Sequence, residues 1–156
     1  MLSYSNAAAI AVGAALKDAL NGGKLYLFAG TVPANADAAL DMVATHTQAA
    51  IITNNDAGTG LSFDTPTNET LNKAAAQTWK GSPNFDGKDD GLTTLTPTFY
   101  RLCESGDDGR GVGTGNRVQG TVGGPSSGAD LELGSATVSS SGSPVEVGLY
   151  RISFTG

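Results

Sequence analysis

One segment of this chain has the composition of a phosphate-binding loop: GDDGRGVGTGN, residues 106–116, with five glycines in eleven residues. A dinucleotide-binding loop follows a strand and opens a helix, whose free N–H groups face the phosphates. Here the next residues, RVQGTV, are rich in β-branched side chains and have no helical period. Asp107 and Asp108 would also repel a phosphate, and no Gly-Lys pair is followed by Ser or Thr, as a Walker A loop requires. The sequence therefore predicts a hairpin connection between two antiparallel strands.

A second segment, NFDGKDDG at residues 84–91, is acidic enough to suggest a calcium site. Its hard oxygen ligands would be the carboxylates of Asp86, Asp89 and Asp90. An EF-hand loop would need an oxygen ligand where Lys88 stands and a glutamate where Pro97 stands. An ion site of another kind stays open, but the composition favours a turn whose Asp and Asn side chains bond the local backbone.

A third segment, GPSSG at residues 124–128, matches the G-x-S-x-G pattern around a nucleophilic serine, here Ser126. That pattern works on a strand-to-helix turn, with an acid and a histidine later in the chain. The one histidine of this chain, His46, lies upstream, and Pro125 between glycines is typical of a linker. A triad in another chain order stays an alternative. His46 lies between two threonines, and we expect it to be a solvated surface residue.

The remaining reactive residues are few. Cys103 is the single cysteine, so no intramolecular disulfide is possible, and a lone cysteine is usually a small core residue. Asp130 and Glu132 alternate along a short strand, where acids on the solvent face are the ordinary case. We therefore predict that the protein is not an enzyme, has no cofactor, and that His46, Cys103 and Ser126 are chemically idle.

Composition excludes further classes of function. The chain has 156 residues, a net charge of −6 and only 15% charged residues, with 22 glycines. Both halves are acidic, so the cationic surface that nucleic-acid binding requires is missing. No stretch approaches the ~20 apolar residues of a membrane span, and the N-terminus does not have the pattern of a signal peptide. With no cysteine pair, we expect folding in a reducing cytoplasm.

Residues 5–20 are predicted to form a helix, capped by Ser5 or Asn6 and ended by the Asn-Gly-Gly at 21–23. One helical face carries mostly small apolar residues, which permit close approach of another backbone. We predict that this face is an assembly interface between subunits or with a shell, and it consists of Ala9, Val12, Gly13, Leu16 and Leu20. The alternative is that the helix covers its own sheet. A short helix is also expected over residues 37–43.

The rest of the chain is predicted to be rich in strands. Residues 24–30, KLYLFAG, place Leu25 and Leu27 on one side and Tyr26 and Phe28 on the other, which indicates a central strand with two apolar faces. Further strands are expected at residues 48–53, 60–65, 77–81, 98–105, 116–123, 129–134 and 143–156, with an irregular or helical piece at 71–76. In the last strand the apolar phase changes, which predicts a β-bulge near Tyr150-Arg151.

These elements predict a mainly β fold: a single antiparallel β-sandwich or barrel domain with an N-terminal α-helix. The domain would span residues 1–156, with the helix in 1–22 and the β domain in 24–156. Residues 41–96 would form an irregular insertion within it.

The order of several short motifs resembles that in a set of small virion proteins of tailed bacteriophages. In the C-terminal half these motifs are TFYRLCES, NRVQGTVG, GADLELG and SPVEVGLYRISF; near the N-terminus they are SNAAAIAVGAAL, GGKLYLFAG and PANAD. The middle departs from the pattern around TNETLNKAAAQTWKGSPNFDGKDDG. The resemblance implies an all-β component of the virion, made in the host cytoplasm, and brings no catalytic residue with it.

The resemblance implies a non-enzymatic capsid decoration (cement) protein that stabilises the head, or alternatively a neck, collar, tail or fibre accessory. Its partners would be the major capsid protein or other virion proteins, and it would be a homo-oligomer, a dimer or a trimer. A more distant alternative is a carbohydrate-binding β-sandwich module. Such a module needs several exposed aromatic side chains in line, whereas Trp79 is the only tryptophan.

Overall fold

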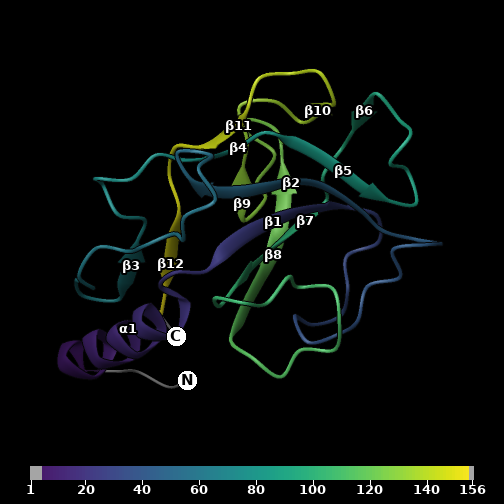
Figure 1. Ribbon diagram of the computed structural model, residues 1–156. Coiled ribbons are helices and arrows are strands. Elements are labelled where there is room, and N and C mark those ends of the chain that lie inside the picture. The colour runs from purple at the N-terminus through teal and green to yellow at the C-terminus, as the bar shows by residue number, and fades with distance from the viewer. Residues whose placement is uncertain (1–4, 155–156) are drawn as a thin grey trace.

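The computed structural model describes residues 5–154, so the parts of the predictions that fall on residues 1–4 and 155–156 lie outside the described residues (Figure 1). One helix is followed by short strands. In chain order they are α1 (Asn6–Leu20), β1 (Lys24–Ala29), β2 (Thr47–Asn54), β3 (Thr70–Asn72), β4 (Trp79–Gly81), β5 (Pro83–Gly87), β6 (Thr94–Leu95), β7 (Phe99–Cys103), β8 (Arg117–Gly123), β9 (Leu131–Glu132), β10 (Val138–Ser139), β11 (Val145–Val147) and β12 (Arg151–Ser153).

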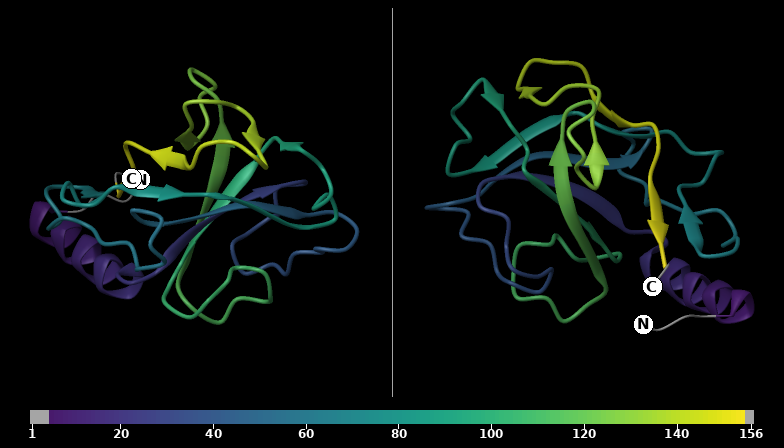
Figure 2. Two further views of the ribbon diagram at one scale, coloured as in Figure 1. Left: turned by 45° about the horizontal axis from the view of Figure 1, so that its top comes forward. Right: turned by 180° about the vertical axis from the view of Figure 1, so that it is seen from behind.

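The main sheet has the strand order β11-β4-β2-β1-β7-β8-β9, with β5 also paired to β2. It curls into a half-barrel, and α1 lies at one end of it (Figures 1 and 2). Two small sheets, β10-β6 and β12-β3, complete the fold. The predicted fold class, mainly antiparallel β with one N-terminal helix, is confirmed. One pair differs, since β9 runs parallel to β8.

Strand β1 has the two apolar faces that its sequence predicts. It lies between β2 and β7, and its residues 25–28 are all buried. Leu25 and Leu27 belong to the larger core, which fills the inside of the curl and includes side chains from both ends of the sheet. Tyr26 and Phe28 belong to a smaller core on the outer face, together with Phe99 of β7. The sheet therefore needs cover on both sides.

Helix α1 is capped as predicted. The N–H of Ala8 donates to Ser5 Oγ at 3.2 Å, and Gly22 takes a left-handed φ of 83° just past the end. A side-chain oxygen at the first position satisfies one of the free N–H groups of the first turn.

The five residues of the predicted assembly face have different environments. Ala9, Gly13 and Leu20 are buried and Leu16 is partly buried against the protein's own core, whereas Val12 is 42% exposed. A Cβ on Gly13 would lie 2.8 Å from Pro66 Cβ, so the helix packs closely there. Most of this face therefore covers its own domain, and its role in assembly stays a prediction.

The short helix expected at residues 37–43 is absent, and this segment forms turns. The reason is local: Asp41 Oδ1 accepts the N–H groups of Val43 and Ala44 at 3.1 and 2.8 Å. An aspartate that bonds the backbone two and three residues ahead favours a turn.

Residues 60–65 do not form the predicted strand and make one isolated bridge, between Phe63 and Lys73. The hydrogen bonds of this segment go to several other segments, since the N–H of Leu61 donates to the Gly23 carbonyl at 2.8 Å and the N–H of Ser62 donates to Gln77 Oε1 at 2.8 Å. Residues 41–96, expected to be an irregular insertion, contain β2 to β6, and β3 extends into the piece expected to be irregular or helical.

The bulge predicted near Tyr150-Arg151 is a break between two strands. β11 pairs with β4 in the main sheet, whereas β12 pairs with β3 in a small one. Leu149 is 79% exposed and Tyr150 is 3% exposed. The alternation of buried and exposed residues therefore shifts by one position where the chain leaves one sheet for the other. The sequence pattern located the change correctly but not its cause.

We predict that Gly13→Leu lowers the free energy of unfolding by about 1–3 kcal/mol, because the added side chain must displace Pro66 and Phe154. Thermal unfolding followed by circular dichroism measures this effect. Ala14→Leu, at the exposed next position, is the matched control and should have little effect. Equal stability of the two variants would contradict the close packing of α1 on its own domain.

Candidate functional site

The serine and acids singled out in the sequence hold a turn together. Ser126 is exposed at a φ of 61°, and its N–H and that of Gly128 donate to the Glu132 carboxylate at 3.1 and 2.9 Å. Asp130 accepts the N–H and the hydroxyl of Thr121 at 2.8 and 2.9 Å. As predicted, both acids lie outside while their strand neighbours are buried. Their carboxylates therefore make separate local contacts.

His46 is 7% exposed, so the expectation of a solvated surface residue is wrong. The N–H of Asp41 donates to Nδ1 at 3.1 Å, which makes Nε2 the protonated nitrogen that donates to the Thr31 carbonyl at 2.9 Å. The ring also packs edge-on against Phe99. Both ring nitrogens therefore form hydrogen bonds with the backbone, and the histidine holds the loop that begins after β1 in place.

Cys103 lies in the smaller core, as expected of a lone cysteine. Burial raises the pKa of its thiol to about 12. Because the thiolate is the nucleophile and the metal ligand, a thiol of this kind is inert near neutral pH.

The three aspartates considered for calcium do not converge. Asp86, on β5, forms an ion pair with Arg110 at 2.7 Å. Asp89 donates its backbone N–H to Thr47 Oγ1 at 2.9 Å, in the turn that follows β5. Within residues 5–154 no three His, Cys, Asp or Glu side chains gather in a way that could hold a metal ion.

An open groove of about 660 Å³ lies between β9 and the β11–β12 segment. Its charged side chains include Glu146 and Arg151, and Tyr150 lies at its base. Burial raises the pKa of Tyr150 well above its usual value, and its hydroxyl lies 3.1 Å from that of Tyr100. The lining also includes the acids Asp130 and Glu132, whose carboxylates bond the backbone.

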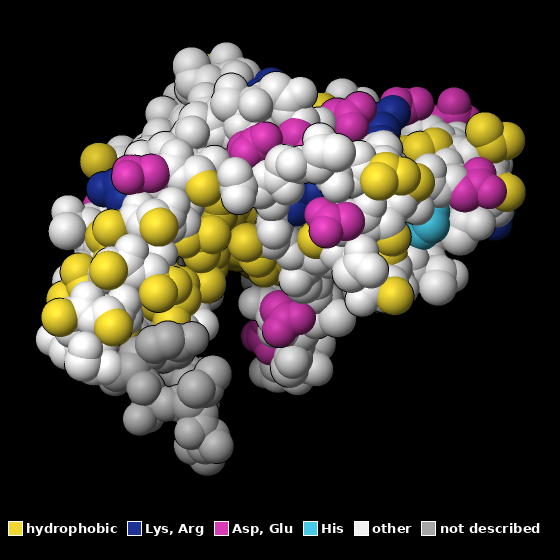
Figure 3. Space-filling model, turned by 90° about the horizontal axis from the view of Figure 1, so that it is seen from below, with side chains coloured by type: hydrophobic (Ala, Val, Ile, Leu, Met, Phe, Trp, Pro, Cys, Tyr) yellow, Lys and Arg dark blue, Asp and Glu magenta, His cyan; other side chains and the backbone are white. Residues whose placement is uncertain are grey.

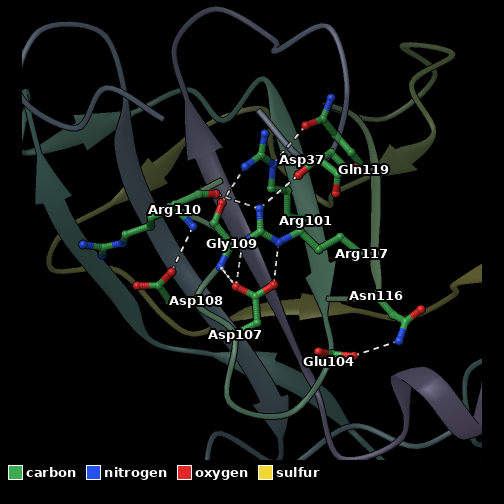
Figure 4. Close-up of polar contacts among 12 residues, drawn as sticks. Asp37, Arg101, Glu104, Asp107, Asp108, Gly109, Arg110, Asn116, Arg117 and Gln119 are labelled. Carbon is green, nitrogen blue, oxygen red and sulfur yellow. Dashed lines mark hydrogen bonds and ion pairs between the residues drawn. The ribbon is translucent and has the colours of Figure 1, made fainter. Parts of the chain in front are cut away.

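An extensive polar cluster is built around three arginines (Figure 4). Arg101, on β7, is completely buried on the same face as Phe99 and Cys103. Its Nε donates to Gln119 Oε1 at 3.0 Å, and its two terminal nitrogens donate to the carbonyls of Gly109 (2.6 Å) and Asn35 (3.2 Å). The guanidinium thereby joins the loop after β1 to the loop between β7 and β8.

Arg117, on β8, supplies the second connection. It binds the Asp107 carboxylate with two nitrogens, and its Nη1 donates to the carbonyls of Ala36 and Gly111 at 3.1 and 2.9 Å. The hydrogen bonds from Arg117 hold the pKa of Asp107 below its usual value. A two-point contact of this kind fixes orientation as well as adding energy.

Arg110 makes the third connection, from the tip of the same loop. Its side chain bonds Gln48 Oε1 at 2.8 Å and pairs with Asp86, while its carbonyl accepts the N–H of Leu40 at 2.7 Å. We call Arg101, Arg110 and Arg117 with Asp107 and Gln119 the arginine cluster.

The arginine cluster fixes two loops over the outer core. Gly109 lies between them at a φ of 73°, and a Cβ there would approach Cys103 Sγ to 2.9 Å. The glycine-rich segment is thus a hairpin connection, as predicted, and its β7 and β8 flanks pair in antiparallel register. Its glycines allow the turn and the close approach rather than the binding of a phosphate.

Sequence reasoning did not single out the arginine cluster. A signal was present, because Arg101 shares its strand phase with Phe99 and Cys103, and a cation among core residues is rare unless it is paired. Its acceptors are mostly backbone carbonyls, one of them 66 residues away, and no sequence pattern indicates these.

Comparison with family models, with curated proteins and with solved structures gives no match for this chain. Within the described residues, no helix is long and apolar enough to cross a membrane.

We predict that Arg101→Lys lowers the free energy of unfolding by about 2–4 kcal/mol, because an ammonium group cannot reach all three buried acceptors. Urea unfolding measures the loss, and limited proteolysis should show faster cleavage within residues 104–117. Arg151→Lys, at an exposed position with the same substitution, is the matched control. Unchanged stability of Arg101→Lys would contradict the structural role of the cluster.

We also predict that Asp107→Asn makes the free energy of unfolding less dependent on pH in the acid range. A carboxyl whose folded-state pKa is depressed stabilises the fold above its unfolded-state pKa, near ~4, and loses that contribution as pH falls through the folded-state value. The variant should be less stable by about 2–3 kcal/mol at pH 7, and the difference should shrink below pH ~4. Asp108→Asn, beside it but outside the Arg117 contact, is the control. A difference that stays constant with pH would contradict this ion pair.

Proposed function

We propose that this protein is a non-enzymatic structural component of a tailed-bacteriophage virion, and specifically a capsid decoration protein that stabilises the head. The observation that carries the proposal is a contrast. His46 and Cys103 are buried and the Asp130 and Glu132 carboxylates bond the backbone, whereas the first three turns of α1 expose apolar surface. A protein with this surface acts by burying area against other subunits.

The motifs that resemble phage virion proteins support the proposal through their positions. TFYRLC and RVQGTVG are the adjacent strands β7 and β8, and DLEL includes β9 next to them. KLYLFA is β1, on the other side of β7. These four segments form one continuous part of the sheet, β1-β7-β8-β9, whereas SPVEVGLYRISF lies apart from it in β11 and β12.

A decoration protein stabilises a shell by binding to the assembled state, so that each bound copy shifts the equilibrium away from rupture. Such a role requires a rigid, weakly charged surface and no reaction. The aromatic side chains of the described residues favour this role over carbohydrate binding. Trp79 is completely buried, Phe85 and Phe154 are partly buried, and the other aromatic side chains of the described residues are buried.

The proposal is tested with particles of the encoding phage that lack this protein. Adding the purified protein should raise the temperature at which heads rupture and release DNA, and electron cryo-microscopy should show added density over the head surface. Heat-unfolded protein is the control. Density confined to the neck or tail would favour an accessory role there, and failure to bind any part of the particle would reject the virion assignment.

A further inference from the structure

The outward side of α1 is apolar over most of its length. Residues 7–16, AAAIAVGAAL, include no charged or hydrogen-bonding side chain. Only Ala9 and Gly13 of this run are buried, and Leu16 is partly buried. The exposed residues, which we call the outer face of α1, are Ala7, Ala8, Ile10, Ala11, Val12, Ala14 and Ala15. A helix that is apolar on all sides is normally buried on all sides.

The outer face is accessible. α1 lies at the edge of the molecule, beside the small β3–β12 sheet and away from the centre of the main sheet (Figures 1 and 2). Hydrophobic side chains gather over this helix in the view from below (Figure 3). Ile10 is 36% exposed and Val12 is 42% exposed, one on each flank of an alanine ridge.

We propose that the outer face of α1 pairs with the same face of a second copy, the two helices running antiparallel about a two-fold axis. The protein carries a net charge of −6, so two copies repel one another over most of their surfaces. The outer face carries no charge. Identical copies can therefore meet there without opposing like charges, and the alanine ridge lets the two backbones approach closely.

The charges at the ends of α1 select the antiparallel direction. Its first turn has no acidic residue of its own to face the free N–H groups and the positive end of the helix dipole. Asp18 is exposed near the other end and lies in line with Ala7, Ala11 and Ala14 at intervals of four, three and four residues. Antiparallel pairing places each Asp18 beside the first turn of the other helix, whereas parallel pairing would bring the two Asp18 carboxylates together.

The small size of the face implies weak pairing in free solution. A helix of 15 residues is about 22 Å long and about 10 Å wide, so half of its surface is about 350 Å². Two copies would bury about 700 Å², less than the ~1,200 Å² of a stable specific interface. Pairs should form at high protein concentration, or where copies are held close together on a common surface.

Sedimentation equilibrium of the free protein, at concentrations up to about 1 mM, tests the pairing. Ala11→Glu places a carboxylate on the ridge of each copy and should raise the dissociation constant at least ~10-fold, because like charges would meet across the interface. Glutamate favours helix, so circular dichroism should show the fold retained. Ala34→Glu, an equal charge change at an exposed site beyond the far end of β1, should pair like the wild type.

Disulfide trapping tests the direction. In the antiparallel pair Ala11 lies opposite Ala14 of the second copy, so a mixture of Ala11→Cys and Ala14→Cys proteins should form a covalent dimer. Two Ala7→Cys residues would be about 16 Å apart along the helix axis, too far for a disulfide. The native Cys103 is buried and can stay in place. Rapid formation of a disulfide between two copies of the Ala7→Cys variant would overturn the antiparallel arrangement.

Two further results would overturn the proposal. One is a wild-type protein that stays monomeric throughout the concentration range. The other is a monomer that sediments with phosphatidylcholine vesicles while Ala11→Glu does not, which would assign the face to a lipid surface. The experiments use free protein, so their outcome is independent of whether the virion assignment holds.

Discussion

The fold depends on one strand that is buried on both faces. β1 lies near the middle of the sheet, with Leu25 and Leu27 on one side and Tyr26 and Phe28 on the other. Curling the sheet covers the first side, because side chains from both of its ends meet in the larger core. The second side faces away from the curl and needs a separate cover. Much of the loop structure of this protein provides that cover.

Few apolar side chains of the covering loops pack on the outer core, so polar contacts hold these loops in place. Leu40 and Met42 are the loop residues that pack on the outer core. The rest of the cover is backbone, whose carbonyls need donors once they are out of water. Arg101 supplies several donors from a single buried position, at the cost of desolvating its charge, which lowers its pKa. A buried cation of this kind stabilises the fold only while its hydrogen bonds are all made.

The sequence was informative where a short segment decides its own structure. The two faces of β1, the Ser5 cap and the hairpin between β7 and β8 follow from local spacing and composition. The burial of His46 does not, because its environment depends on Thr31, which lies 15 residues away. The same holds for the parallel pairing of β9 and for the carbonyls around Arg101. Each of these features is set by segments that come together only in the folded chain.

The position of α1 separates the part of its surface that the fold uses from the part that it leaves open. Because Gly13 has no side chain, the helix can lie close to Pro66 and Phe154, and only a narrow face is buried there. Most of the open surface is alanine, and leaving one methyl group in water costs only about 0.8 kcal/mol. A free subunit can tolerate that cost, since it is divided among many small side chains along the helix. When another surface covers these methyl groups, their burial recovers that free energy. This suits a contact that is weak between free subunits and stronger where many copies lie side by side.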